Sequence, residues 1–334
     1  MENQIQAQEH AFQLLGGMMN SFVLSALIRN GVIEALNSGI NTVDKLSEKC
    51  KVDLNVLSRT LRYAGLIGMV SLSENRYSLT DVGRFFLKDV QGSLYGSASF
   101  ISAPPWRDSW MNFEHCLKTG ESAFNYVFGE PFFQFLDSKP EYGKPFHQYM
   151  ANISVMVASV VAEAYDFNKF KTICDVGGGQ GVLLKAILDK TPASKGILFD
   201  MENVVKNHVL GDLTDRVQIV TGSFFNSVPP ADCMVLKTII HDWNDENSIQ
   251  ILSNCRKSLK KSGKIILIEQ VVEEPFTLTA LFYDLHMQVM LGGAERTEQE
   301  YNSLFEAAGL KTDRIINTKT PMKIIVISEM IDKL

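Results

Sequence analysis

A histidine and two glutamates stand at positions where they could share one proton. His241 follows an apolar stretch by a few residues, Glu269 ends the next apolar stretch, and Glu295 lies in a glycine-rich segment, residues 292–297. An imidazole titrates near neutral pH, so it can take a proton from an oxygen nucleophile. A carboxylate on the other ring nitrogen would fix the tautomer and stabilise the imidazolium. These residues predict a general base with an acidic partner, which is either Glu269 or Glu295.

A second segment with chemical potential, residues 172–188, holds four glycines between two apolar runs. Residues 172–176 are β-branched and apolar and predict a buried strand, while the apolar residues after Gly181 recur at helical spacing. Glycines let the backbone approach a ligand and adopt positive φ, and a helix start offers free N–H groups to a negative group. The segment predicts a ligand cradle; the alternative is a tight turn that binds nothing.

The spacing of these glycines narrows the choice of ligand. The dinucleotide fingerprint G-x-G-x-x-G needs a glycine where Val182 stands, and no Gly-Lys-Ser/Thr is present for a triphosphate. A second apolar run ends in Asp200, where a carboxylate can accept hydrogen bonds from both ribose hydroxyls. Together the two stretches resemble the S-adenosylmethionine site of Rossmann-like methyltransferases.

Strands and helices must alternate to position these groups. From Thr172 onward the pattern predicts an α/β fold with a Rossmann-like, mostly parallel sheet and helices on both faces. Active residues of such sheets lie beyond the carboxyl ends of strands. A lone histidine more often has a structural role, but this location makes a catalytic role for His241 an equal alternative. The expected strands are residues 172–176, 196–200, 216–223, 233–237, 264–269 and 322–328, and the expected helices include 247–260 and one that opens with a capping box at 297–300.

Residues 1–95 predict a separate, mostly α-helical winged-helix domain. One short helix begins at Thr42, and Asp53 caps a second helix that is expected to stop at Gly65. Two short strands, 68–72 and 76–79, follow. The range holds nine Lys/Arg and nine Asp/Glu, so it lacks the positive surface that phosphate binding needs. An apolar, Met-rich stripe over residues 11–36 must be buried by something, either its own core or a second copy of the chain. We therefore expect a dimerisation domain and no nucleic-acid partner.

Residues 96–170 link this domain to the rest of the α/β domain, 96–334. They are rich in aromatic residues, most of which are expected in the core and some in the wall of a pocket for a planar aromatic ligand.

The composition of the chain restricts its expected partners and its expected cellular location. The chain has 334 residues, enough for two domains, and its net charge of −6 argues against nucleic acid or an anionic membrane as the main partner. The first ten residues lack the basic region of a signal peptide, and no apolar run approaches the length of a membrane span. Five scattered cysteines without a C-x-x-C pair indicate a reducing compartment, so a cytoplasmic location is expected.

Several motifs in combination resemble the caffeate-type O-methyltransferases, a family of plant and bacterial small-molecule enzymes. They are the glycine bend 177–181, Asp200, residues 227–232, the triplet 241–243 and the segment 292–297. The resemblance covers essentially the whole chain. It implies a homodimer, S-adenosylmethionine as cofactor with S-adenosylhomocysteine as product, no metal, and a small phenolic or polyketide-type aromatic substrate.

The resemblance also assigns roles to individual residues. It implies His241 as the base, flanked by the two acids Glu269 and Glu295. The implied cofactor-binding residues are Asp175, Gly177, Gly179, Asp200, Met201, Ser223, Phe224 and Lys237. The implied substrate-binding residues are Asn125, Phe146, Met150, Asp242, His286 and Met290.

One position departs from the family pattern. After the third strand the family usually reads Gly-Asp-Met/Phe-Phe, and the Asp accepts a hydrogen bond from the adenine amino group; here the residues are Gly222-Ser223-Phe224-Phe225. Serine is shorter and uncharged, so this contact is expected to be weaker or water-mediated. Phe224 can still stack on adenine.

Three other functions compete with methyl transfer. A same-fold enzyme could bind S-adenosylmethionine and catalyse hydroxylation, decarboxylation or a pericyclic step, but the presence of His241 with both acids argues against it. A winged-helix regulator that senses a metabolite is disfavoured by the neutral charge count of residues 1–95. A metal-dependent catechol methyltransferase is disfavoured because no Asp/Asn ligand cluster follows the fourth strand.

Overall fold

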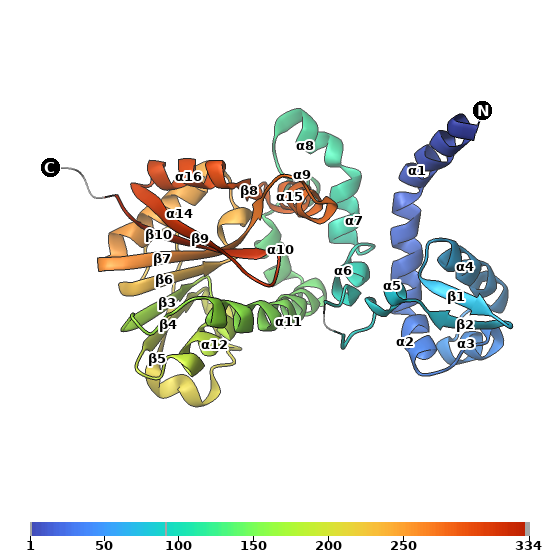
Figure 1. The fold of residues 1–334 in the computed structure, drawn as a ribbon, viewed down its shortest axis with the longest axis horizontal. Helices are drawn as coiled ribbons and strands as arrows, with labels where there is room; N and C mark the ends of the chain where they lie inside the picture. The colour runs from blue at the N-terminus through green and yellow to red at the C-terminus, as the bar shows by residue number, and fades with distance from the viewer. Residues whose placement is uncertain (1, 91, 331–334) are drawn as a thin grey trace. The chain divides into compact units, whose positions relative to one another are not determined.

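The computed structural model describes residues 2–90 and 92–330 (Figure 1). It divides into two compact units, Met1–Met111 and Asn112–Leu334. The sequence places this boundary after residue 95, whereas the structure groups α6 (Tyr95–Phe100) and α7 (Pro104–Met111) with the N-terminal unit. A hydrogen bond of 2.6 Å between the Ser25 and Ser102 hydroxyls ties this segment to α1 (Glu2–Arg29).

The first unit has the expected helix, helix, hairpin order. Helices α3 (Val43–Cys50) and α4 (Leu54–Leu66) precede an antiparallel pair, β1 (Val70–Ser73) and β2 (Arg76–Leu79), and α5 (Asp81–Arg84) follows. The Asp53 carboxylate caps α4 by accepting the Val56 N–H at 2.8 Å, as the sequence predicts. The expected stop at Gly65 was wrong: the helix continues to Leu66, and Gly68 takes the left-handed conformation with φ of 78°.

The apolar stripe over residues 11–36 forms two helices rather than one. Gly31, with φ of 73°, separates α1 from α2 (Val32–Asn37). Apolar side chains of α1 stay exposed in this single chain, among them Phe12 at 73% and Leu15 at 77%. The expectation that no apolar run reaches the length of a membrane span was wrong. By length and composition the helical segment Gln4–Arg29 could cross a membrane, and 17% of its 18-residue apolar stretch is buried. A helix that packs on another protein surface has the same composition.

The second unit is built on one large sheet (Figure 1). Its strand order is β5-β4-β3-β6-β7-β10-β9, with a short β8 (Arg296–Thr297) beside β7. The first five are parallel, and β10 is antiparallel to both β7 and β9. Their bounds are β3 (Thr172–Val176), β4 (Lys195–Asp200), β5 (Val217–Thr221), β6 (Ala231–Lys237), β7 (Leu259–Val272), β9 (Leu310–Asn317) and β10 (Met322–Glu329). The α/β prediction is confirmed, but β8 and β9 were missed.

Helices cover both faces of this sheet. On one face α11 (Pro140–Ala164) and α12 (Val182–Lys190) bury their apolar residues, and on the other face α14 (Asp245–Ser258) and α16 (Glu298–Ala307) do so. The predicted capping box of α16 is present: Thr297 and Glu300 exchange hydrogen bonds at its first turn. The remaining helical segments are α8 (Phe113–Thr119), α9 (Ala123–Phe128), α10 (Phe132–Ser138), α13 (Glu202–Val205), α15 (Leu278–Leu291) and the 3₁₀ turns η1 (Gly211–Arg216) and η2 (Ile240–Asp242).

The aromatic residues before the sheet are less buried than expected. Phe124 is fully buried and meets the rings of Phe132 and Phe135 edge-on, at centroid distances of 5.1 and 5.3 Å. By contrast, Tyr126 and Phe133 are exposed, and most of the others are only partly covered. Core packing therefore explains a minority of them.

Candidate active site

His241 lies in η2, the turn that follows β6 and crosses the carboxyl end of the sheet. The chain enters this turn through Thr238, whose φ of 52° places a β-branched residue in the left-handed region. Such a conformation is strained and persists only when neighbouring structure imposes it. Here the Thr238 N–H donates to the Ile268 carbonyl of β7 at 3.0 Å, which ties the strained residue to the next strand.

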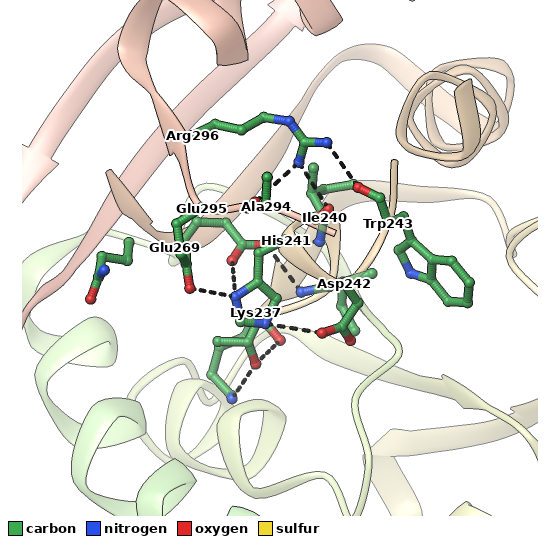
Figure 2. A network of polar contacts seen from close by, with 12 residues as sticks. Lys237, Ile240, His241, Asp242, Trp243, Glu269, Ala294, Glu295 and Arg296 are labelled. Carbon is green, nitrogen blue, oxygen red and sulfur yellow. Dashed lines mark hydrogen bonds and ion pairs between the residues drawn. The ribbon is translucent and has the colours of Figure 1, made fainter. Parts of the chain in front are cut away.

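Three carboxylates surround the imidazole (Figure 2). Glu295 Oε1 lies 2.8 Å from His241 Nδ1, whereas Glu269 Oε2 lies 3.9 Å from the same nitrogen. On the other side of the ring, Asp242 Oδ1 lies 3.3 Å from Nε2. The sequence left two candidates for the partner of His241; only Glu295 is within hydrogen-bond distance of Nδ1.

Glu269 instead holds the backbone of the turn. Its Oε1 accepts the N–H groups of Ile239 at 3.0 Å and Ile240 at 2.8 Å. Its Oε2 is buried and has no hydrogen-bond partner among the residues that the structure describes, and the same holds for Glu295 Oε2. The cluster therefore contains two buried carboxylate oxygens for which the described part of the chain supplies no donor.

The charges in this cluster shift one another. Burial lowers the pKa of His241, but Glu269, Asp242 and Glu295 raise it by more, to about 10. Burial raises the pKa of Glu269 to about 7 and that of Asp242 to about 6, although the charge of His241 opposes both shifts. The cluster thus holds a proton firmly, and the imidazole is its most basic member.

Lys237 places an ammonium group between the imidazole cluster and the glycine bend. Its Nζ donates to the Thr238 hydroxyl at 3.0 Å (Figure 2). Burial lowers its pKa, while the nearby carboxylates of Asp175, Glu269 and Asp242 raise it. Its charge therefore acts both on the imidazole cluster and on the acid beneath the glycine bend.

The glycine bend has the geometry expected of a cradle. Gly177, Gly179 and Gly181 have φ of 68°, 59° and 81°. A Cβ on Gly177 would lie 2.5 Å from the Ile239 side chain, while one on Gly179 would meet no atom within 4 Å. The bend is therefore packed on one side and open on the other.

The two acids near the bend have different positions. Asp200 accepts the Gly179 N–H at 2.8 Å through one oxygen and the Met201 N–H at 2.7 Å through the other, so it lies at the rim of the cradle. Asp175 is buried and accepts the Leu184 N–H at 3.3 Å. At least one N–H of the start of α12 that we expected to be free for a ligand is therefore occupied by Asp175.

The segment after β5 lies beside the same bend. A Cβ on Gly177 would be 3.6 Å from the ring of Phe224, and this ring meets Trp243 edge-on at 6.0 Å. The Ser223 hydroxyl accepts the Phe225 N–H at 3.3 Å, so it is partly engaged within its own turn. Met201 is 53% exposed on the rim.

These residues fit a nucleoside cofactor. The open side of Gly179, the carboxylate of Asp200 and the ring of Phe224 supply a close backbone approach, a hydroxyl acceptor and a stacking surface. The Nε1–H of Trp243 is a further buried donor with no partner within the described chain.

The predicted substrate residues come from three helices, α9, α11 and α15, and from the turn η2, which carries Asp242. Met290 is buried at the end of α15, where the Ser122 hydroxyl donates to its carbonyl at 3.2 Å and joins α9 to α15. His286 stacks on Phe282 at 5.9 Å, and burial followed by the charge of His241 lowers its pKa to about 4. Asn125 is exposed on α9.

Phe146 and Met150, the other two predicted pocket residues, are partly buried on α11. Phe146 meets Phe132 edge-on at 5.3 Å. Burial raises the pKa of Asp200, and the charge of His147, the neighbour of Phe146, opposes this shift. This part of α11 therefore lies toward the cofactor acid.

His241, Glu269 and Glu295 are also a set that could hold a metal ion, because one ligand atom from each lies within 4.8 Å of the others. However, the 2.8 Å between Nδ1 and Glu295 Oε1 is a hydrogen-bond distance. Two ligands about 2.0 Å from a tetrahedral ion would lie about 3.3 Å apart. The structure therefore fits a shared proton better than an ion, and the absence of a metal stays a prediction.

Two features of the site were missed in the sequence. A Cβ on Gly293 would lie 2.1 Å from the His241 carbonyl oxygen, and the Ala294 N–H donates to that oxygen at 3.0 Å. The paired glycines ahead of a candidate acid were the signal for this close approach. Arg296, which has only 4% exposure, is the second missed residue.

Comparison with known proteins agrees with this architecture. An O-methyltransferase domain matches residues 110–311, and an O-methyltransferase dimerisation domain matches residues 12–89. The chain is 33% identical over 322 residues to a phenazine O-methyltransferase of Lysobacter antibioticus, a match that covers 94% of each protein.

Solved structures show the same similarity. The structure of a mitomycin 7-O-methyltransferase superposes with a TM-score of 0.91 at 29% identity, over 98% of this chain and 99% of that one. An O-methyltransferase from neocarzinostatin biosynthesis, in complex with S-adenosylmethionine and 2-hydroxy-5-methyl naphthoic acid, superposes with a TM-score of 0.81 at 25% identity, over 93% and 96% of the two chains.

Proposed function

The chain belongs to the O-methyltransferase family with a dimerisation domain, and on that premise we propose that it methylates a hydroxyl of a small aromatic metabolite with S-adenosylmethionine as donor. In this proposal His241 is the general base and Glu295 is its hydrogen-bonded partner. The observation that carries the proposal is the 2.8 Å contact between His241 Nδ1 and Glu295 Oε1, buried at the carboxyl end of the sheet next to the glycine bend.

In this proposal, Nε2 is the ring nitrogen that takes the proton from the acceptor. In the neutral imidazole, when Nδ1–H donates to Glu295, the lone pair of Nε2 is free to accept a proton. Asp242 Oδ1 lies 3.3 Å from Nε2, so an acceptor hydroxyl must replace this carboxylate as the neighbour of Nε2. The Asp242 carboxylate then lies where it can hold the substrate hydroxyl or a group beside it.

The raised pKa of His241 is close to the pKa of a phenolic acceptor. The carboxylates raise the pKa of His241 to about 10. A phenol hydroxyl such as that of tyrosine titrates near 10, so proton transfer from a phenol to this imidazole is close to balanced. General-base assistance of this kind typically contributes about 10²–10⁴-fold to the rate.

The glycine bend, Asp200, Phe224 and Lys237 are the residues proposed to hold the cofactor. When bound, S-adenosylmethionine supplies a methyl group that is already activated for transfer. The protein must therefore align the acceptor oxygen and exclude water from it. The burial of His241 and Glu269 helps to exclude water from the acceptor oxygen.

The proposed acceptor class rests on the pocket and on the relatives. Aromatic and methionine side chains on α11 and α15 suit a planar ring. By their names, two of the relatives act on a phenazine and on mitomycin, and the structure of a third is in complex with a naphthoic acid.

We also propose an oligomeric state and a cellular location for the chain. The exposed apolar side chains of α1 lie in the segment that matches the dimerisation domain, which supports a homodimer. A cytoplasmic location stays a proposal.

The test of the function is methyl transfer from isotopically labelled S-adenosylmethionine to a panel of hydroxylated aromatic acids and polycyclic phenols. A product heavier than the acceptor by one methyl group, formed by the natural chain and not by His241→Ala, would support the proposal. Calorimetric binding of the cofactor without transfer to any acceptor would instead favour a same-fold enzyme of another reaction class.

A further inference from the structure

Arg296 is a buried cation at the edge of the site that the proton-transfer chemistry does not use. It begins β8 and pairs with Val271 of β7, two residues beyond Glu269. A guanidinium with 4% exposure is costly unless every donor finds an acceptor. The acceptors that the Arg296 guanidinium contacts therefore indicate its role in the structure.

The guanidinium bonds to the backbone on both sides of His241. Its Nη1 donates to the Ile240 carbonyl at 3.2 Å and its Nη2 to the Trp243 carbonyl at 2.8 Å. These carbonyls belong to the residue just before His241 and to the second residue after it. The arginine therefore spans the turn that carries the base (Figure 2).

The same guanidinium also bonds to the segment that carries Glu295. Nη1 donates to the Ala294 carbonyl at 3.4 Å, directly before Glu295 in the chain. The Ala294 N–H returns a hydrogen bond to the His241 carbonyl at 3.0 Å. Arg296 thus joins the peptide before the base to the peptide before its acidic partner.

Asp245 completes the set of acceptors. Its Oδ1 accepts from Arg296 Nε at 3.1 Å and from Nη2 at 2.8 Å, and its side chain is 73% exposed. The carboxylate therefore anchors the guanidinium from the solvent side. Only the planar fork of an arginine reaches these acceptors at once, since a lysine ammonium is a single point of charge.

We propose that Arg296 is a positioning residue, which sets the distance between His241 Nδ1 and Glu295 Oε1 by clamping the two backbone segments that carry them. It touches neither the imidazole nor the proposed reacting atoms. This inference rests on the proposed function for its catalytic consequence, but its structural consequence can be measured without turnover.

The same unit contains a matched control. Arg216, at the amino end of the sheet, also binds backbone carbonyls: Nη1 donates to Thr191, Pro192 and Ser194 at 2.9–3.2 Å, and Nη2 donates to Leu188 at 3.0 Å. It clamps loops that carry none of the proposed site residues. Arg216→Lys therefore removes the same kind of fork without approaching His241.

The experiment compares Arg296→Lys, Arg216→Lys and Asp245→Asn in the full-length chain, with the pKa of His241 followed by NMR of its imidazole. Arg296→Lys keeps the charge and loses the fork. We expect it to lower the pKa of His241 from its raised value, because Nδ1 and the Glu295 carboxylate drift apart. Asp245→Asn, at an exposed position, should shift the pKa in the same direction by less, and Arg216→Lys should leave it unchanged.

Turnover provides the second readout. Small misplacement of a catalytic group can cost about 10²-fold in rate, so Arg296→Lys should lower kcat by about 10–10²-fold with an unchanged dissociation constant for S-adenosylmethionine. If Arg296→Lys folds poorly, Asp245→Asn carries the test.

The outcomes separate the two proposals. An unchanged His241 pKa in both Arg296→Lys and Asp245→Asn would overturn the positioning role even if methyl transfer is established. Equal shifts in Arg296→Lys and Arg216→Lys would also overturn it, since they would reflect general loosening. A shift confined to Arg296→Lys and Asp245→Asn, in a protein that methylates no acceptor, would keep the positioning role and reject the proposed function.

Discussion

The two ends of the central sheet use similar polar groups in different ways. At the amino end, Arg216 donates to four backbone carbonyls, and Asp232 accepts the Thr172 N–H at 2.9 Å and lies 3.6 Å from the Lys260 ammonium. At the carboxyl end, Glu269 and Glu295 each keep a buried oxygen without a donor among the described residues, and Thr238 is strained.

This difference separates stability from function. Where a polar side chain is matched as Arg216 and Asp232 are, removing it costs folding free energy and little else. Where charges are buried and only partly matched, the fold maintains an arrangement that is able to hold and release a proton. The predictions below test whether the two ends respond to substitution in these two ways.

The largest effect is expected for His241→Ala. Loss of the base should lower kcat by about 10²–10⁴-fold, while the affinity for S-adenosylmethionine should hold because the glycine bend and Asp200 are untouched. Single-turnover transfer and calorimetric binding would measure the two quantities. Full turnover of this variant would remove His241 from the mechanism.

A smaller loss is expected for Gly293→Ala. The added Cβ would lie 2.1 Å from the His241 carbonyl oxygen, so the segment that carries Glu295 must move away from the turn. Displacement on this scale costs up to about 10²-fold in kcat. The control is Gly65→Ala in the N-terminal unit, where the Cβ would meet only the Val70 carbonyl oxygen, at 3.7 Å, and where, as at Gly293, φ is not positive. Equal losses in both variants would contradict the account.

Glu269→Gln and Glu269→Ala separate charge from backbone support. Glutamine keeps an oxygen that can accept the Ile239 and Ile240 N–H groups but removes the buried charge, so about tenfold lower kcat at unchanged stability is expected. Alanine leaves both N–H groups unpaired and should cost about 1–3 kcal/mol for each in urea unfolding. Equal stability of the two variants would show that the turn does not depend on this oxygen.

At the amino end, Asp232→Ala should change stability alone. It removes the acceptor of the Thr172 N–H, at a cost of about 1–3 kcal/mol, whereas Asp232→Asn keeps an acceptor and should cost less. The kcat per folded molecule should equal that of the natural chain in both variants. A loss of kcat would mean that the two ends are coupled.

The sequence was a good guide to elements with strong local patterns. The alternation of strands and helices, the cap at Asp53 and the capping box at Thr297 follow from local composition, and all are present. The sequence did not predict the strands whose formation depends on pairing with distant parts of the chain. β8 has two residues and exists through its pairing with β7, and β9 carries a mixed burial pattern at the edge of the sheet.

The site shows the same division. His241, Glu269 and Glu295 were predicted because each residue type follows a strand end or a glycine pair. The choice between the two acids depends on 2.8 Å against 3.9 Å across the fold, which no spacing along the chain reveals. Arg296 was missed for a related reason, because its acceptors are backbone carbonyls that every residue possesses.

The most direct measurement of the central claim is the pH dependence of kcat/KM for the natural chain and for Glu295→Gln with one acceptor. The carboxylates raise the pKa of His241 to about 10, so below that pH the imidazole is protonated and kcat/KM should rise with pH above the ordinary range of histidine. Removal of the Glu295 charge lowers the pKa of His241, so the rising limb should move to lower pH and reach a lower plateau. Ionisation of the acceptor is common to both proteins and cancels in the comparison. An identical limb in the two proteins would contradict a proton held between His241 and Glu295.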